Sequence, residues 1–226
     1  MLRLVGICLL LFPLAAGAQA GDANIEKGKK QSSKAADAAL MAQLADNLVA
    51  YGDRNKDALA LISAARIHKQ IGTRFEKMQK DKEGQPGAKP KSAAVRDNSV
   101  AAILERAKKY AGGRKDLIAI ADEIAKQGSR GELGGPRVWN EQVLPKDTDL
   151  YRLRFTGGTP AVVFISGDGD TDLDLIVKDD RGNVVCVADG DTDREACSWI
   201  PRRTAEFRIE IKNLGNVYNN YRAGHN

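Results

Sequence analysis

The chain has few of the residue types on which most catalytic motifs depend. Its 226 residues include only two histidines, three cysteines and 5% aromatic residues. Neither His68 nor His225 stands in a His-Glu-x-x-His or comparable metal motif, and there is no Gly-x-Ser-x-Gly elbow. The pairs Lys56-Asp57 and Lys115-Asp116 are expected to start helices rather than to act as acid–base pairs. The sequence therefore predicts a protein that is not an enzyme. A glycosidase, which needs only two carboxylates, is the alternative that composition leaves open.

Long apolar runs are also scarce, and the one that occurs lies at the N-terminus. Arg3 precedes an apolar stretch from Leu4 to Leu14, which is too short to cross a bilayer comfortably. Ala18-Gln19-Ala20 then supplies a small-x-small cleavage site. We predict that residues 1–20 are a signal peptide and that the mature protein is periplasmic or secreted, with no transmembrane segment. An uncleaved anchor is the alternative.

Export would place the cysteines of the mature protein in an oxidising compartment. Cys8 lies within the predicted signal peptide, so the mature chain keeps Cys186 and Cys197. Two cysteines in an oxidising compartment favour a disulfide, and two buried free thiols are the alternative. If residues 184–188 and 194–200 form a hairpin, Cys186 faces Cys197 across two adjacent strands. Two cysteines without nearby histidine fall short of a four-ligand zinc site.

Charge divides the chain into two parts. Residues 21–140 hold 23 Lys/Arg and 15 Asp/Glu, a net charge of 23 − 15 = +8, whereas residues 141–226 hold 11 and 15, a net charge of 11 − 15 = −4. This change of sign predicts a domain boundary. The basic residues are interspersed with acids and aromatics are scarce, so no nucleic-acid partner is expected.

The basic part is expected to be helical. After a flexible leader at residues 21–33, apolar residues recur at three- and four-residue steps, which is the helical period. Two helical hairpins are predicted, over residues 34–81 and 95–127, followed by a linker at residues 128–137. The buried face of the first helix is expected to consist of Leu40, Leu44, Leu48 and Tyr51.

The two predicted hairpins resemble each other. Tyr51 and Lys56-Asp57 of the first correspond without a gap to Tyr110 and Lys115-Asp116 of the second, at an offset of 110 − 51 = 59 residues. Duplication of a helix–turn–helix unit is the simplest account of this helical hairpin repeat. The expected packing is a four-helix bundle, or a helical array that docks on another element.

Beyond the linker, short β-rich runs alternate with turns. Ala161–Ile165 is continuously apolar, as in a core strand, and the turn at Asp180–Asn183 separates two further runs. Seven strands are predicted, at residues 150–155, 161–165, 173–177, 184–187, 196–200, 205–211 and 217–222. The predicted fold class is therefore α+β, with N-terminal helical hairpins followed by an antiparallel β-sandwich over residues 138–226.

The β part resembles the bacterial pre-peptidase C-terminal (PPC) domain, a secreted β-sandwich often appended to peptidases. The matching elements are Gly169–Val177, Gly182-Asn183, Cys186, Glu195–Cys197, the Pro201 turn, Phe207–Ile211 and Tyr218–Tyr221. The helical part lies outside this resemblance, and no peptidase domain accompanies the module. The resemblance implies a role in binding, targeting or folding rather than catalysis, and some related domains bind calcium or extracellular polymers.

Two acidic loops are the candidate metal site of the β part. The turn at Asp180–Asn183 reverses the chain between them, so both loops are expected at the same end of the sandwich. Carboxylates gathered at one end repel each other unless they are solvated or neutralised, and calcium suits flexible carboxylate loops. The predicted calcium ligands are Asp168, Asp170, Asp172, Asp189, Asp191 and Asp193. Exposed turns without a metal are the alternative.

We expect an exported, non-enzymatic binding or structural protein of the cell envelope, whose sandwich binds a protein or a glycan and is stabilised by calcium. The alternative, by analogy alone, is an accessory or targeting subunit for a separately encoded secreted peptidase. A glycan-binding sandwich should expose an aromatic platform. The local candidates for it are Trp139, Trp199, Tyr218 and Tyr221.

Overall fold

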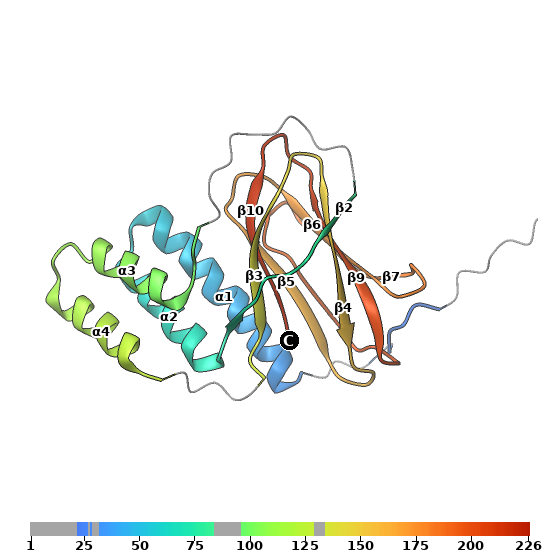
Figure 1. The fold of residues 1–226 in the computed structure, drawn as a ribbon, viewed down its shortest axis with the longest axis horizontal. Coiled ribbons are helices and arrows are strands. Elements are labelled where there is room, and N and C mark those ends of the chain that lie inside the picture. The colour runs from blue at the N-terminus through green and yellow to red at the C-terminus, as the bar shows by residue number, and fades with distance from the viewer. Residues whose placement is uncertain (1–21, 27, 29–31, 84–95, 129–133) are drawn as a thin grey trace, which may run out of the picture.

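The fold is α+β, as predicted, with helical hairpins followed by two antiparallel-rich sheets (Figure 1). The computed structural model describes residues 22–26, 28, 32–83, 96–128 and 134–226. The predicted signal peptide, residues 1–20 with Cys8, lies outside the described residues, as do residues 84–95 and residues 129–133 of the predicted linker. The described helices are α1 (Lys34–Asn55), α2 (Ala58–Ile71), α3 (Val100–Tyr110) and α4 (Lys115–Lys126).

Side-chain caps define where the first three helices begin. The Ser33 hydroxyl accepts from the backbone N–H of Ala36 at the start of α1, and Ser99 caps α3 in the same way. Asp57 caps α2, while Gly72 ends α2 in the left-handed conformation at φ +67°. Of the helices in the described ranges, none is both long enough and apolar enough to span a membrane.

The buried face of α1 is not the predicted one. Leu40, Leu44 and Tyr51 are 42%, 46% and 54% exposed, and only Leu48 packs against the helical core. The buried face instead consists of small residues, namely Ala36, Ala39, Ala42, Ala45, Val49 and Gly52, together with Asp46. Small side chains allow close approach. At Gly52, for example, a Cβ atom would lie 2.8 Å from Leu61 Cδ2 of helix α2.

Ten described strands form two five-stranded sheets. Sheet A has the order β1-β3-β10-β5-β8, and sheet B has the order β2-β4-β9-β6-β7. Their bounds are β1 (Arg74–Phe75), β2 (Asp81–Glu83), β3 (Arg137–Val143), β4 (Thr148–Phe155), β5 (Ala161–Gly167), β6 (Leu173–Lys178), β7 (Val184–Ala188), β8 (Ala196–Trp199), β9 (Ala205–Asn213) and β10 (Asn219–His225). All pairings are antiparallel except that of β1 with β3. All seven predicted strands occur, whereas β1, β2 and β3 were not predicted.

Helix α1 docks on the outer face of sheet A and lies between that sheet and the other helices (Figure 1). Its alanines Ala36, Ala39 and Ala42 form one apolar cluster with Val138, Val162 and Phe164 of sheet A. Strand β5 is therefore covered on both faces, by the sandwich core on one side and by α1 on the other. This explains why every residue of β5 is buried and why its sequence does not alternate.

A segment between α2 and α3 closes one open side of the sandwich. We call residues 73–83 the strap. The strap first pairs through β1 with β3 of sheet A and then through β2 with β4 of sheet B, so it crosses from one sheet to the other (Figure 1). Both strands of the strap are short and exposed, which leaves no alternation for a sequence pattern to detect.

The disulfide closes the opposite side. Cys186 and Cys197 are bonded, as predicted, but the predicted hairpin is wrong. Strand β7 pairs with β6 at the edge of sheet B, and β8 pairs with β5 at the edge of sheet A. The bond therefore joins two edge strands across the sandwich rather than two neighbours within one sheet.

Part of the predicted flexible leader is held against the sandwich. Asn24 is 5% exposed, its backbone N–H donates to Asp179 Oδ2, and its side-chain amide donates to the carbonyl of Arg203. Ile25 packs against the sandwich core. These contacts bind residues 22–26 to the turn between β6 and β7 and to the segment after β8.

We predict that removing the disulfide weakens the sandwich without changing its fold. Because the bond closes a loop with a separation of 11 residues, Cys186→Ala with Cys197→Ala should lower the free energy of unfolding by about 2–3 kcal/mol. Urea denaturation of the oxidised protein and of the double variant measures the difference. A reductant should bring the wild-type protein to the level of the variant and leave the variant unchanged. Equal urea midpoints for oxidised and reduced wild-type protein would contradict the prediction.

Candidate functional site

A cavity of about 410 Å³ lies between the C-terminal half of α1 and the outer face of sheet A. This volume is within the usual range of small-ligand sites. Its lining comes from α1, residues 96–98, β3, the end of β5 and β10, and is mostly polar. The lining residues are Asp46, Val49, Ala50, Asp53, Arg54, Arg96, Asn98, Asn140, Ser166, Gly167, Asp168, Asn220, Tyr221 and Arg222. Among the residues predicted as ligands, only Asp168 and Tyr221 belong to it.

Arg222 of β10 holds the floor of the cavity together. Its side chain is 3% exposed, and each of its three nitrogens donates to a different segment. Nη1 lies 2.5 Å from Asp46 Oδ1 on α1, Nε lies 2.9 Å from Asn140 Oδ1 on β3, and Nη2 lies 2.8 Å from the Asn98 carbonyl. The guanidinium also lies 5.0 Å from the ring centre of Phe75 on the strap. Arg222 thus connects β10 to four other segments, namely α1, β3, residue 98 and the strap.

Asp46 has a second partner, His68 of α2. His68 Nε2 lies 3.2 Å from Asp46 Oδ1, and Nδ1 lies 3.0 Å from Thr73 Oγ1. An ionised carboxylate only accepts, so in neutral His68 the Nε2–H donates to Asp46 and Nδ1 accepts from the Thr73 hydroxyl. The order hydroxyl, imidazole, carboxylate is that of a catalytic triad. However, His68 is 1% exposed, and neither His68 nor Thr73 lines the cavity. These contacts join α1, α2 and the strap.

One wall of the cavity is rich in arginine. Asp53 accepts from Arg96 Nη1 and from Arg106 Nε, each at 2.9 Å. Arg54 forms no ion pair with any described residue, and its Nη2 lies 3.0 Å from the place that a Cβ atom would take at Gly169. Asp53 is therefore already paired, Arg54 beside it is not, and the lining of this wall carries excess positive charge.

The other wall is acidic. Asp168, at the end of β5, accepts from the backbone and side-chain N–H groups of Asn220 at 3.1 and 2.9 Å, and from the backbone N–H of Asp170. No described lysine or arginine forms an ion pair with Asp168. The cavity thus has a positive wall on α1 and a negative wall at the end of β5.

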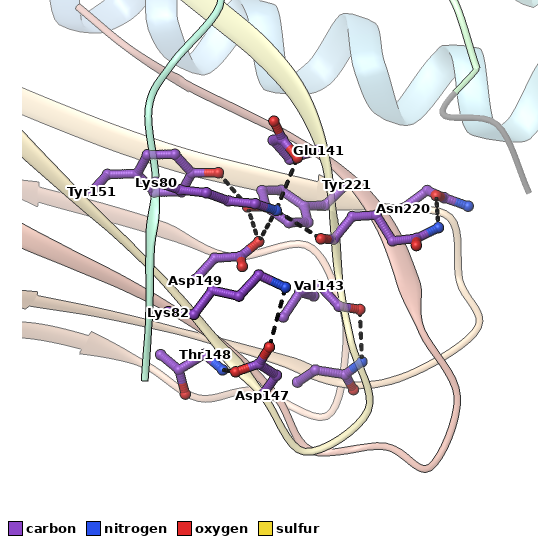
Figure 2. A network of polar contacts seen from close by, with 12 residues as sticks. Lys80, Lys82, Glu141, Val143, Asp147, Thr148, Asp149, Tyr151, Asn220 and Tyr221 are labelled. Atoms are coloured by element: carbon purple, nitrogen blue, oxygen red, sulfur yellow. Dashed lines mark hydrogen bonds and ion pairs between the residues drawn. The ribbon is translucent and has the colours of Figure 1, made fainter. Parts of the chain in front are cut away.

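A buried polar network supports the β10 side of the cavity from within the sandwich (Figure 2). The Tyr221 hydroxyl donates to Asp149 Oδ2 at 2.7 Å and accepts from the Tyr151 hydroxyl at 2.6 Å. Lys80 of the strap lies 2.8 Å from the same carboxylate oxygen. Burial raises the pKa of Asp149, while the charge of Lys80 opposes that rise. Burial also raises the pKa of Tyr151 and Tyr221, so both stay neutral donors.

The network continues to the cavity wall. Lys80 also donates to the Gln142 carbonyl and pairs with Glu141, at 2.8 and 2.9 Å (Figure 2). The Gln142 side-chain amide donates to Asn220 Oδ1 at 2.9 Å, and Asn220 in turn holds Asp168. The position of the acidic wall is therefore tied, through β3 and β10, to the strap.

The two predicted calcium loops are adjacent. Asp193, 2% exposed, accepts from the backbone N–H of Gly169 in the first loop, and the Leu173 N–H donates to the Thr192 carbonyl. Partial burial, and then neighbouring carboxylates, raise the pKa of Asp170 and of Asp172. Across the described ranges, however, no three His, Cys, Asp or Glu side chains are arranged to hold a metal ion. The calcium site stays a prediction without geometric support.

The predicted aromatic platform is largely buried. Trp139, Trp199 and Tyr221 are 2%, 4% and 2% exposed, and Tyr218 is partly exposed. Both tryptophans belong to the sandwich core, where Trp199 and Phe155 form an edge-to-face pair with ring centres 4.9 Å apart. These residues offer no stacking surface for a sugar.

Sequence reasoning missed most of the cavity because its residues come from separate segments. One signal was available. Asp46 interrupts a helical face otherwise made of Ala39, Ala42, Ala45 and Val49, and a carboxylate on a buried face needs a partner. That signal required the alanines, rather than the leucines, to be recognised as the buried face.

Comparison with known proteins gives similarity at the level of fold only. No family model and no curated protein sequence matches the chain. Similar solved structures include PliG, a periplasmic inhibitor of g-type lysozyme from Aeromonas hydrophila, at 13% identity over 40% of this chain and 83% of that chain, with a TM-score of 0.33. The pre-peptidase C-terminal domain of a Bacillus anthracis collagenase is 8% identical over 42% of this chain and 80% of its own, with a TM-score of 0.26. A de novo designed double-stranded β-helix is 17% identical over 40% and 99%, with a TM-score of 0.27. These scores are too low to carry an argument about function.

We predict that Lys80→Met destabilises the protein by about 3–5 kcal/mol at neutral pH, because it leaves the buried Asp149 carboxylate without its ion-pair partner. Lys80→Met with Asp149→Asn should recover most of the loss. Urea denaturation measures both variants. The matched control is Lys77→Met, an exposed lysine of the same strap, and a loss no greater than in that control would contradict the prediction.

The stability of Lys80→Met should also depend on pH, in a direction that follows from the pKa of Asp149. Burial raises the pKa of Asp149, and without the opposing charge and hydrogen bond of Lys80 that pKa rises further, so the folded state binds the proton more tightly than the unfolded state. The stability deficit of Lys80→Met, measured as its difference from wild type in free energy of unfolding, should therefore shrink as the pH falls from neutral toward the pKa of Asp149 in the folded variant. A deficit that is constant with pH would contradict this account.

A second pH dependence is expected at the acidic loops. Burial and neighbouring carboxylates raise the pKa of Asp172, so its ionised form disfavours the folded state above the unfolded-state pKa. Asp172→Asn should raise the free energy of unfolding at pH 7 by up to about 1 kcal/mol, since the side chain is partly exposed. The gain should vanish at acidic pH. Thermal unfolding in EDTA measures it, with the exposed Asp189→Asn as control, and a destabilised Asp172→Asn would refute the expectation.

Proposed function

We propose that the protein is an exported, non-enzymatic binding protein of the cell envelope, and that the cavity between α1 and sheet A binds a segment of a protein partner. Export is supported by the predicted signal sequence at residues 1–20 and by the disulfide between Cys186 and Cys197. The binding role is supported by the cavity, which is the observation that carries the proposal.

The cavity has the properties of a built site rather than of a packing defect. Its floor is fixed by Arg222, whose side-chain nitrogens bind α1, β3 and residue 98. A fixed floor means that the walls keep their positions when a ligand enters, which reduces the entropic cost of binding. Most of its lining residues are polar and offer both donors and acceptors.

A protein segment suits this lining better than a glycan. The one aromatic residue in the lining, Tyr221, is buried, so the cavity lacks the flat aromatic surface that commonly supports a sugar ring. A peptide presents backbone C=O groups, which can accept from the side-chain NH2 groups of Asn98 and Asn140, whose amide oxygens are already bound by Arg106 and Arg222.

The lining gives no support to catalysis. Ser166 is a hydroxyl in the cavity, but its Oγ donates to Asn47 Oδ1 at 3.0 Å and contacts no base. The Tyr221 hydroxyl is bound to Asp149 inside the sandwich. No lining residue is a histidine or a cysteine. A nucleophile beside a base, which acyl transfer requires, is not formed by these residues.

The proposal is tested by titrating the isotope-labelled, oxidised mature protein with a pool of random tripeptides that are blocked at both ends. Saturable shifts of the backbone amides of Asn98, Ser166 and Asn220 are expected, whereas Val187 on the distant edge strand should not respond. Because Ala50→Trp fills the cavity from α1, it should weaken binding by about tenfold or more.

The matched control is Ala101→Trp, at an exposed position of α3 that does not line the cavity. Thermal unfolding of both variants confirms that they fold. Shifts that are scattered over the surface, or binding that Ala50→Trp leaves unchanged, would refute the cavity as the binding site.

A further inference from the structure

We propose that the segment bound in this cavity carries both an acidic and a basic group, with the acidic group on the Arg54 side and the basic group on the Asp168 side. The inference rests on the proposed function and deepens it, because it specifies the charge pattern of the partner. The supporting observation is the distribution of charge over the two walls and the floor of the cavity.

The α1 wall lacks a counter-charge. Among the lining residues, Arg54 and Arg96 bring two positive charges and Asp53 brings one negative charge, a net charge of 2 − 1 = +1. Both oxygens of Asp53 are already bound, Oδ1 by Arg106 and Oδ2 by Arg96. Arg54 is left without an acceptor among the described residues, so a carboxylate of the ligand would meet an unneutralised guanidinium there.

The wall at the end of β5 carries negative charge that is not fully compensated. Asp168 is held by the N–H groups of Asn220 and by no described cation. Asp170 follows in the same loop, and its pKa is raised first by partial burial and then by the neighbouring carboxylates of Asp168 and Asp193. Arg194 pairs with Asp193 at 3.5 Å and does not reach Asp168. An ammonium or guanidinium of the ligand would relieve this repulsion.

The floor cannot supply either charge. The Arg222 guanidinium is committed to Asp46, Asn140 and the Asn98 carbonyl, and Asp46 Oδ1 is committed to Arg222 and His68. Asp46 Oδ2 has no partner but is buried from solvent, so it is out of reach of a ligand. The charges of a ligand must therefore be met at the walls. A ligand with one charge meets one favourable and one repulsive wall, whereas a ligand with both charges matches both walls.

Arg54 and Asp168 do not neutralise each other directly. Arg54 lies against Gly169, where a Cβ atom would be 3.0 Å from its Nη2, yet the structure contains no ion pair between Arg54 and Asp168. Gly169 adopts φ +92°, a conformation that side-chain-bearing residues rarely take. The glycine thus lets the guanidinium approach the acidic loop while both charges remain available.

The inference is tested with four tripeptides blocked at both ends: lysine-alanine-glutamate, lysine-alanine-glutamine, glutamine-alanine-glutamate and glutamine-alanine-glutamine. Amide shifts at Asn98 and Asn220 give each dissociation constant. The doubly charged peptide should bind about tenfold or more tightly than the neutral one, with both singly charged peptides between them. The gain should fall with added salt, because the walls are open to solvent.

Two variants assign the charges to the walls. In Arg54→Gln, the glutamate of the peptide should no longer increase affinity over glutamine, whereas the lysine should still do so. In Asp168→Asn, the lysine should lose its effect on affinity and the glutamate should keep it. Each comparison is a double-mutant cycle between protein and peptide. Arg66→Gln, which makes the same change of net charge at an exposed position away from this cavity, should alter neither gain.

The outcomes separate this inference from the proposed function. Equal, saturable binding of all four peptides at the cavity amides would overturn the charge pattern and leave the binding site standing. Loss of the lysine gain in Arg54→Gln would overturn the assignment of the walls. Absence of binding by every peptide up to about 10 mM, a limit that corresponds to negligible affinity, would overturn both. Shifts at the same amides with neutral chitotriose, and none with the peptides, would also overturn both in favour of a glycan.

Discussion

The buried ion pair between Arg222 and Asp46 is the contact on which the arrangement of the two halves depends. Burying two charges is costly, and their attraction offsets the cost only when further hydrogen bonds satisfy them. Here Asn140 and the Asn98 carbonyl bind Arg222, and His68 binds Asp46 Oδ1, while Asp46 Oδ2 is left without a partner among the described residues. Separating α1 from sheet A would break this ion pair, and with it the hydrogen bond from Arg222 to α1. The pair therefore fixes one docking geometry, and the cavity forms beside it.

A second constraint is the closure of the sandwich at its two open sides. Unpaired edge strands invite pairing with other chains, and this protein covers them differently on each side. The strap adds a strand to each sheet, and Lys80 anchors it on Asp149 inside the core. On the opposite side, where none of the described strands crosses between the sheets, the disulfide ties β7 to β8. The helical half thus contributes to the sandwich itself, since the strap follows directly from α2.

The parts of the fold that were predictable from the sequence are those set by local pattern. The strands from β4 to β10 follow from alternation and from apolar runs, and the cysteine pairing follows from their number. The face of α1 was predicted wrongly because leucine dominates a hydrophobic pattern, whereas close packing on Val162 and Phe164 selects alanine. The hairpin of β7 and β8 was wrong because neighbours in sequence can belong to opposite sheets. The cavity was missed because Asp46, Asn140 and Arg222 meet only after docking.

The location of the cavity has a consequence for how binding and folding are linked. Its positive wall belongs to α1 and residue 96, and its negative wall belongs to the sandwich, so neither half contains the site alone. A ligand that contacts both walls binds only the docked arrangement and stabilises it by mass action. The charges of the two walls also favour the docked arrangement, because the positive wall on α1 attracts the negative wall on the sandwich across the junction. Recognition in this protein is therefore a property of the junction between helices and sandwich, and Arg222 keeps that junction closed before any partner arrives.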